Sequence, residues 1–179
     1  MKKSLLQITM IIPIILLLCF TFSCQQQVEE GITEEEAKAF IDWDLEIWNE
    51  GNLAVADDLY DPDYVQHSIE LEDIVGIDAF KEDVTILRTD YPDFNLTTEE
   101  IIVKNDKIVW RWIATGTNTG TTSDIPPTGK KFRISGIGII HVVNGKFVER
   151  WMYYNEATVL RQLGFIFTPP QPPAPQEKE

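Results

Sequence analysis

The chain has 179 residues, with 29 acidic and 15 basic side chains and a formal net charge of −14. A surface this acidic repels phosphate backbones and offers no basic footprint, so we exclude nucleic-acid binding. The length that remains between the two terminal segments suits a single domain with one hydrophobic core.

The first residues predict export from the cytoplasm. Met1–Lys3 is a short basic segment, Ser4–Phe22 is almost unbrokenly apolar, and the chain turns polar directly after Cys24. We interpret residues 1–23 as a lipoprotein-type signal peptide and Cys24 as the lipidated residue, because no small-x-small cleavage triplet competes nearby. The alternatives are a non-lipidated signal peptide and an uncleaved membrane anchor. Lipidation would hold the protein outside the cytoplasm, on the periplasmic or surface side of a bacterial membrane.

Processing would change both the charge and the thiol content. The removed segment contains Lys2, Lys3 and Cys19, so 13 of the 15 basic residues remain against 29 acidic ones, a net charge of −16. With Cys24 acylated, the mature domain keeps no cysteine, and we expect neither disulfides nor thiol chemistry.

Two terminal segments flank the domain that we expect over residues 33–167. Residues 24–32 form a polar tether, and residues 168–179 contain five of the ten prolines. Such a tail favours extended polyproline II structure without a core, and we interpret it as disordered; the alternative is a PxxP ligand.

The N-terminal half of this domain has the pattern of helices. The segment Thr33–Glu36 has the T-x-x-E signature of a capping box, and apolar residues then recur at helical spacing up to Gly51. A second short helix is predicted from Asn52, its cap, to Leu59, followed by an extended piece over Tyr64–Ser68. A third helix carries Ile77, Phe80, Val84 and Leu87 and ends before Pro92.

After Pro92 the apolar period changes from 3.6 to 2, which indicates strands. Four are predicted over Phe94–Val103, Ile108–Thr119, Lys131–Val143 and Lys146–Tyr154. Helices followed by an antiparallel meander predict an α+β domain, in which the helices cover one face of a bent sheet and leave a cone with an open mouth.

The turn Asn144-Gly145 predicts the register of the last hairpin. If it is a two-residue turn, Val143 pairs with Lys146. Large side chains then lie opposite glycines, as expected where rings need room across a strand pair. A bulge in either strand would exchange the two faces. Without a bulge, one face carries Gly136, Gly138, Glu149, Trp151, Tyr153 and Asn155, and the other carries Ile139, His141, Val148, Arg150 and Met152.

Several motifs resemble the SnoaL-like polyketide cyclase and ester cyclase family, which belongs to the nuclear transport factor 2-like superfamily. These are WNEGNLAVADDLYDPDYVQHS, YPDFNLTTEEIIVKNDKIVWRW, the loop IPPTGKKF and the final QLG. The resemblance covers nearly the whole mature domain. With the predicted lipidation site, it suggests that the chain is a secreted lipoprotein member of this family. It implies a cone-shaped fold of N-terminal helices on a strongly curved antiparallel sheet, with a pocket for a small hydrophobic carbonyl-type ligand.

The resemblance also implies a chemistry. In the polyketide cyclases of this family an aspartate removes a proton next to a carbonyl, and the enolate closes a ring without metal or organic cofactor. That aspartate, after a tryptophan and three residues, falls on Asn155 in this chain. An amide cannot accept the proton at neutral pH. Asn155 is therefore either a pocket hydrogen-bonding group or the cap of a helix that starts near Thr158.

Three ionisable residues are candidates to replace the missing base. His67 matches a histidine common in the family, and its alternative is an edge histidine. Asp44 lies on or near the apolar face of the first helix, where a carboxylate is costly unless partnered, and its alternative is a boundary position facing water. Glu149 shares the predicted face of Trp151 and Asn155, and its alternative is an exposed strand charge.

Three function classes remain open: a cofactor-free cyclase, isomerase or dehydratase; a non-catalytic ligand-binding lipoprotein; and a dimeric interaction module. No metal site is expected, because the histidines and acids match no ligand spacing. We expect a homodimer through a sheet face bearing Ile137, Ile139, Val148 and Met152. The aromatic residues expected to line the pocket are Trp48, Tyr64, Trp112, Trp151 and Tyr153.

Overall fold

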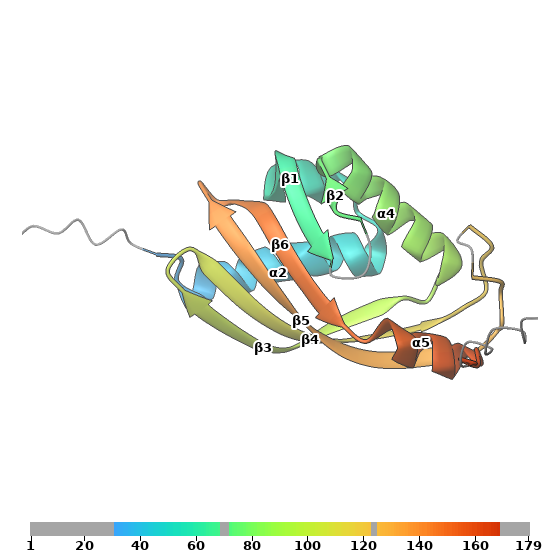
Figure 1. The fold of residues 1–179 in the computed structure, drawn as a ribbon. Coiled ribbons are helices and arrows are strands. Elements are labelled where there is room, and N and C mark those ends of the chain that lie inside the picture. Colours follow the sequence, from blue (N-terminus) through green and yellow to red (C-terminus); the bar gives the residue numbers. More distant parts are fainter. Residues whose placement is uncertain (1–30, 69–71, 123–124, 169–179) are drawn as a thin grey trace, which may run out of the picture. The chain divides into compact units, whose positions relative to one another are not determined.

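The computed structural model describes residues 31–68, 72–122 and 125–168 and shows an α+β domain (Figure 1). The predicted signal peptide, Cys24, most of the tether and all but the start of the tail lie outside these residues. The described helices are α2 (Glu34–Glu50), α3 (Ala54–Leu59), α4 (Ile77–Asp90) and α5 (Glu156–Leu163). The strands are β1 (Tyr60–Ser68), β2 (Ile74–Val75), β3 (Asn95–Lys104), β4 (Lys107–Thr117), β5 (Lys131–Val143) and β6 (Lys146–Tyr154).

The six strands form one sheet in the order β2-β1-β6-β5-β4-β3. The meander β3-β4-β5-β6 is antiparallel, as predicted, but β1 pairs with β6 in parallel. The expected antiparallel sheet is therefore a mixed one, because β1 comes from the helical half of the chain and adds to the free edge of the last strand.

Local signals explain where helix α2 begins and ends. The Thr33 side chain accepts a hydrogen bond from the Glu36 N–H, and the Glu36 carboxylate accepts one from the Thr33 N–H, which completes the predicted capping box. The helix ends at Gly51, whose φ of 73° suits glycine. Helix α3 begins at Ala54, two residues after the predicted cap Asn52.

The last hairpin follows the predicted register only at its tip. Asn144 and Gly145 have φ values of 52° and 76°, as a two-residue hairpin turn requires. The tip pairs are Val143–Lys146 and Val142–Phe147, but the next pair is His141–Glu149, so Val148 is an extra residue in β6. This β-bulge moves every later residue of β6 to the other face, and the face assignment made without a bulge is wrong beyond Phe147.

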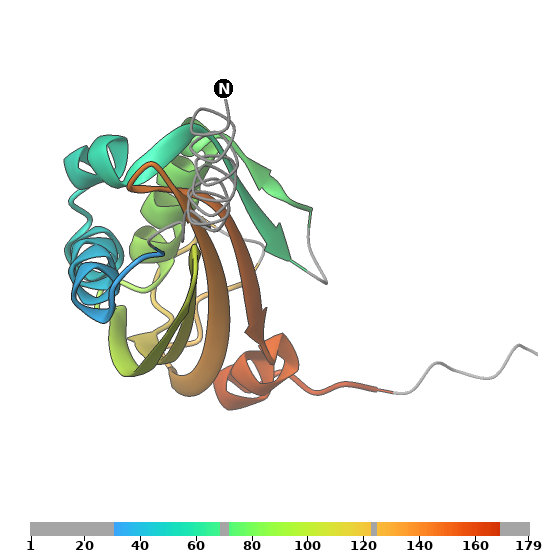
Figure 2. The same cartoon turned by 90° about the vertical axis from the view of Figure 1, so that its left-hand side faces the viewer.

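Helices α2, α3 and α4 lie over one face of the curved sheet, which we call the inner face and which carries Trp110 and Trp112 (Figures 1 and 2). Helix α5 packs against β5 at the end of the sheet opposite the start of α2. In β6 the bulge turns Arg150, Met152 and Tyr154 to the inner face.

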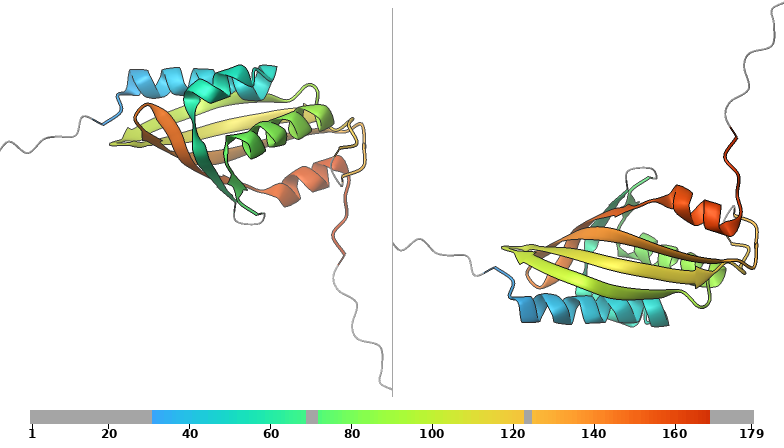
Figure 3. Two further views of the ribbon diagram at one scale, coloured as in Figure 1. Left: turned by 90° about the horizontal axis from the view of Figure 1, so that it is seen from above. Right: turned by 90° about the horizontal axis from the view of Figure 1, so that it is seen from below.

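The opposite, outer face carries Arg111 and Ile113 of β4, and no described helix crosses it when the molecule is seen from below (Figure 3, right). Ile137 and Tyr153 are 41% and 42% exposed on this face. Met152, expected there as part of a dimer surface, faces inward instead. No helix among the described residues is long and apolar enough to span a membrane.

Candidate functional site

A cavity of about 430 Å³ lies between the inner face of the sheet and helices α4 and α5. Its size falls in the range typical of small-molecule sites. Strand β1 contributes Gln66 and Ser68 at one side, and α5 contributes Val159 and Leu160 at the end. The remaining wall is mostly apolar and includes Leu87, Phe94, Leu96, Ala114, Ile125, Phe132, Ile134 and Met152.

Two of the five aromatic residues predicted to bind ligand, Trp48 and Trp112, line this cavity. Trp48 is 6% exposed and Trp112 is 3% exposed, and the indole N–H of each is buried without a hydrogen-bond partner among the described residues. A buried donor without a partner costs about 1–3 kcal/mol.

Gly136 makes room for Trp112. These residues are directly paired between β5 and β4, and a Cβ atom at Gly136 would lie 2.3 Å from Trp112 Cζ2. The sequence predicted Gly136 opposite Tyr153 and Gly138 opposite Trp151, but β6 pairs them with Tyr154 and Met152 instead. The ring that needs the space at Gly136 is Trp112 of β4.

Asp83 of α4 is a cavity residue that sequence reasoning missed. Burial raises the pKa of its carboxyl from 3.8 to about 6. It makes neither a hydrogen bond nor an ion pair with any described residue. The signal was present in the sequence, because Asp83 follows Phe80 by three residues and precedes Leu87 by four on the apolar side of the helix.

The ionisable side chains of this wall are acidic or phenolic. Glu72 and Glu156 join Asp83 as carboxylates, and Tyr91 and Tyr154 are the phenols. None of the described residues that line the cavity is lysine, arginine or histidine.

Asp44 is buried in the core and does not line the cavity. Arg150 Nη2 lies 2.5 Å from Asp44 Oδ2, and the Tyr60 hydroxyl donates a 2.5 Å hydrogen bond to Asp44 Oδ1. All three residues have no solvent exposure. Burial raises the pKa of Tyr60 well above 10 and so keeps this phenol a donor. Arg150 and Tyr60 thus offset the free-energy cost of burying a carboxylate on the apolar face of α2, and Asp44 is a core residue.

Three aromatic rings surround the Arg150 guanidinium, in addition to the carboxylate of Asp44. Its guanidinium carbon lies 5.6, 5.9 and 5.4 Å from the ring centroids of Tyr60, Trp110 and Phe147. Its Nε and Nη1 have no hydrogen-bond partner among the described residues. The sequence placed Arg150 on the face of His141; the bulge at Val148 turns it inward instead.

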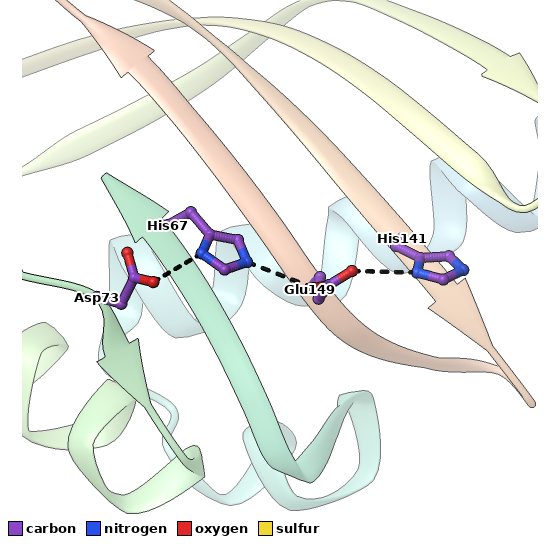
Figure 4. A network of polar contacts seen from close by, with 4 residues as sticks. All are labelled: His67, Asp73, His141 and Glu149. Carbon is purple, nitrogen blue, oxygen red and sulfur yellow. Dashed lines mark hydrogen bonds and ion pairs between the residues drawn. The ribbon is translucent and has the colours of Figure 1, made fainter. Parts of the chain in front are cut away.

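His67 and Glu149 lie together on the outer face, away from the cavity (Figure 4). His67 Nδ1 is 2.8 Å from Asp73 Oδ2, and His67 Nε2 is 3.4 Å from Glu149 Oε1. Glu149 Oε2 is 3.5 Å from His141 Nδ1, and His141 Nε2 is 2.9 Å from Asp106 Oδ2. Two histidines thus alternate with three carboxylates across β1, β6 and β5.

The surroundings of His67 favour its charged form. Desolvation opposes the charge, but hydrogen bonds and charges from Asp73 and Glu149 outweigh it and raise the pKa of the imidazole above 6.5. The ring stacks on Trp151 at a centroid distance of 5.1 Å. Among the described residues no group of three or more histidines, cysteines or acids has the geometry of a metal site.

The remaining predicted site residues lie outside the cavity wall. Asn155 caps α5: its Oδ1 accepts a 3.0 Å hydrogen bond from the Thr158 N–H, which agrees with the structural alternative. Tyr64 is fully buried behind Gln66, to which its hydroxyl donates a 3.2 Å hydrogen bond. The bulge places Trp151 and Tyr153 on the outer face.

The cavity wall therefore carries a carboxyl group with a raised pKa and two rings whose buried N–H groups lack a partner among the described residues. A carboxyl group whose pKa is about 6 exchanges its proton readily near neutral pH. His67, Glu149 and Asp44, the three predicted bases, have no access to this cavity in the structure.

Comparisons with known proteins agree with this architecture. The sequence profile described as SnoaL-like polyketide cyclase matches residues 39–163. No curated protein matches the chain significantly.

Among similar solved structures, TsrD from Streptomyces laurentii has a TM-score of 0.68 and 25% identity over 75% of this chain and 98% of its own. AclR, a candidate hydroxylase from Streptomyces galilaeus, has a TM-score of 0.65 and 25% identity over 78% of this chain and 87% of its own. IdmH, a candidate polyketide cyclase from Streptomyces antibioticus, has a TM-score of 0.62 and 26% identity over 72% of this chain and 99% of its own. With the profile match and this fold, the chain belongs to the SnoaL-like polyketide cyclase family of the nuclear transport factor 2-like superfamily.

Proposed function

We propose that the cavity binds a small, mostly apolar molecule that carries a carbonyl or similar hydrogen-bond-accepting oxygen. The observation that supports this most strongly is that Trp48 and Trp112 line a largely apolar cavity while their buried indole N–H groups have no hydrogen-bond partner among the described residues. A ligand oxygen would satisfy donors that are otherwise costly to bury.

We further propose cofactor-free acid–base chemistry on that ligand, with Asp83 as the proton acceptor. Removal of a proton next to the carbonyl would form an enolate, whose oxygen the indole N–H groups would stabilise. Isomerisation, cyclisation and dehydration all begin with this step. Polyketide cyclases of the family use an aspartate at the position that is Asn155 in this chain. Asp83 of α4 would take over the role of that aspartate.

A non-catalytic binding protein is the second candidate. It is favoured by Asn155, whose amide caps α5 and cannot act as a base. Binding without turnover would also suit a lipoprotein anchored through Cys24 outside the cytoplasm. The mass of the mature N-terminus tests the anchor: we expect a diacylglyceryl-modified, N-acylated Cys24 that is lost in Cys24→Ala, and an unmodified cysteine would contradict it.

Calorimetry with two probes of one shape tests the binding proposal. We expect 2-acetylnaphthalene to bind more tightly than 2-ethylnaphthalene, and Trp112→Phe to reduce this preference about three- to tenfold by removing one N–H. Trp43→Phe is the matched control, because Trp43 is 45% exposed and does not line the cavity. Equal affinities for the two probes, or no binding of either, would contradict the proposal.

A further inference from the structure

We propose that the cavity selects a cationic apolar molecule, such as a protonated amine, over a carboxylic acid of the same shape, with Asp83 as the counter-ion. This inference rests on the proposed function, because it presumes that the cavity takes up a small molecule. The inference specifies the charge of the molecule that the cavity binds, which the proposed function leaves open.

The first support is the one-sided charge of the wall. Asp83 of α4, Glu72 before β2 and Glu156 of α5 contribute carboxylates from three separate segments, and the described lining residues include no basic side chain. A ligand carboxylate would have to enter a largely apolar cavity against like charges, which is costly. A ligand cation would meet the opposite charge without displacing an existing partner.

The second support is that the nearby basic residues of α4 are already engaged. Lys81 Nζ lies 2.6 Å from Asp57 Oδ1, and Arg88 Nη1 donates a 2.9 Å hydrogen bond to the Trp48 carbonyl. Asp83 lies between these two residues in the helix and makes no ion pair with either. By contrast, the fully buried carboxylate Asp44 has Arg150 as its partner. The described residues thus supply no positive charge that pairs with Asp83.

The third support concerns the body of the ligand. Trp48, Tyr91, Phe94, Trp112, Phe132 and Tyr154 surround the cavity with aromatic rings. Ring faces attract cations, and the rings also bury apolar surface. Two of these rings, Trp48 and Trp112, carry buried N–H groups that have no hydrogen-bond partner among the described residues.

Calorimetry of the purified domain with three probes of one shape tests this selectivity at fixed pH 7.5 and physiological salt. The probes are 2-naphthylmethylamine, 2-naphthylmethanol and 2-naphthoic acid. We expect the amine to bind at least tenfold more tightly than the alcohol, and the acid to bind most weakly. In Asp83→Asn the advantage of the amine over the alcohol should fall below about threefold.

Glu82→Gln is the matched control, because it removes the same charge from the neighbouring, exposed position of α4. The preference for the amine should survive this change if it comes from the cavity and not from the net charge of the protein. Acid binding as tight as alcohol binding, or an equal loss of preference in both variants, would overturn the inference and leave the proposed function standing. If none of the three probes binds, the proposed function and the inference both fail.

Discussion

Replacing Asp83 with asparagine should stabilise the protein at neutral pH and have little effect in acid. Burial raises the pKa of this carboxyl from 3.8 to about 6, so the folded protein holds the proton more tightly than the unfolded chain. The stabilisation from this tighter protonation is fully present below 3.8 and is lost as pH rises through about 6. The two values correspond to a loss of roughly 3 kcal/mol, and partial solvation of the carboxylate reduces this to about 1–2 kcal/mol. Asparagine has a similar shape and cannot ionise.

Urea unfolding at pH 4.0 and pH 7.5 measures this effect. The gain in unfolding free energy from Asp83→Asn should be about 1–2 kcal/mol larger at pH 7.5 than at pH 4.0. Glu82→Gln controls for the loss of one negative charge from the same helix and should differ little between the two pH values. A gain that is equal at both pH values would refute the reasoning, because it would show that ionisation of Asp83 costs nothing in the folded state.

Three further predictions concern the core, the cavity wall and the outer face. Asp44→Ala should lower the unfolding free energy by about 3–5 kcal/mol, because it leaves Arg150 buried without its partner. The control Asp42→Ala, on the exposed side of α2, should change the unfolding free energy by less than about 0.5 kcal/mol. Similar losses in the two variants would contradict the role of the ion pair. Gly136→Ala should lower the free energy of unfolding, measured by heat or urea, by about 1–3 kcal/mol, because the new Cβ would lie 2.3 Å from the Trp112 ring. Gly138→Ala should lower it by less, since the nearest contact of its Cβ would be the Met152 sulfur at 3.3 Å. Asp73→Asn should lower the pKa of His67 towards 6.5 in an NMR titration, since Asp73 is a cause of its elevation, and an unchanged midpoint would remove that cause.

The parts of the fold that the sequence predicted well are those with local causes. The capping box at Thr33 and the glycine at position 51 define α2 within a few residues of the chain, and the Asn144-Gly145 turn defines where β5 and β6 meet. Each of these signals acts between neighbours, so no knowledge of tertiary contacts is needed to interpret them.

The candidate site was harder to predict for two reasons. The faces of β6 depend on a single extra residue, Val148, and the buried ion pair joins residues that are far apart in the sequence. The extra residue Val148 reverses the faces of β6, which moves Glu149, Trp151 and Tyr153 away from the cavity. The same β-bulge brings Arg150 to Asp44, a residue on the first described helix. No local pattern marks either event, since the strand keeps its alternation on both sides of the bulge.

The importance of Asp83 was hidden for a different reason. A carboxylate within a stripe of apolar residues is normally interpreted as a boundary position that faces water. Only the three-dimensional arrangement shows that this side of α4 faces a cavity and that Lys81 and Arg88 are bound elsewhere.

The position of Arg150 also has a consequence for the order in which the protein is made. Arg150 follows Asp44 by 106 residues, and β6 lies between the β2-β1 pair and the three strands of the meander. During synthesis the ribosome therefore releases Asp44, the first helices and five strands before the strand that joins them and carries the neutralising charge. Contacts between such distant residues form late and slow the folding of a domain. The domain therefore cannot complete its core or neutralise Asp44 until nearly all of the chain has been synthesised.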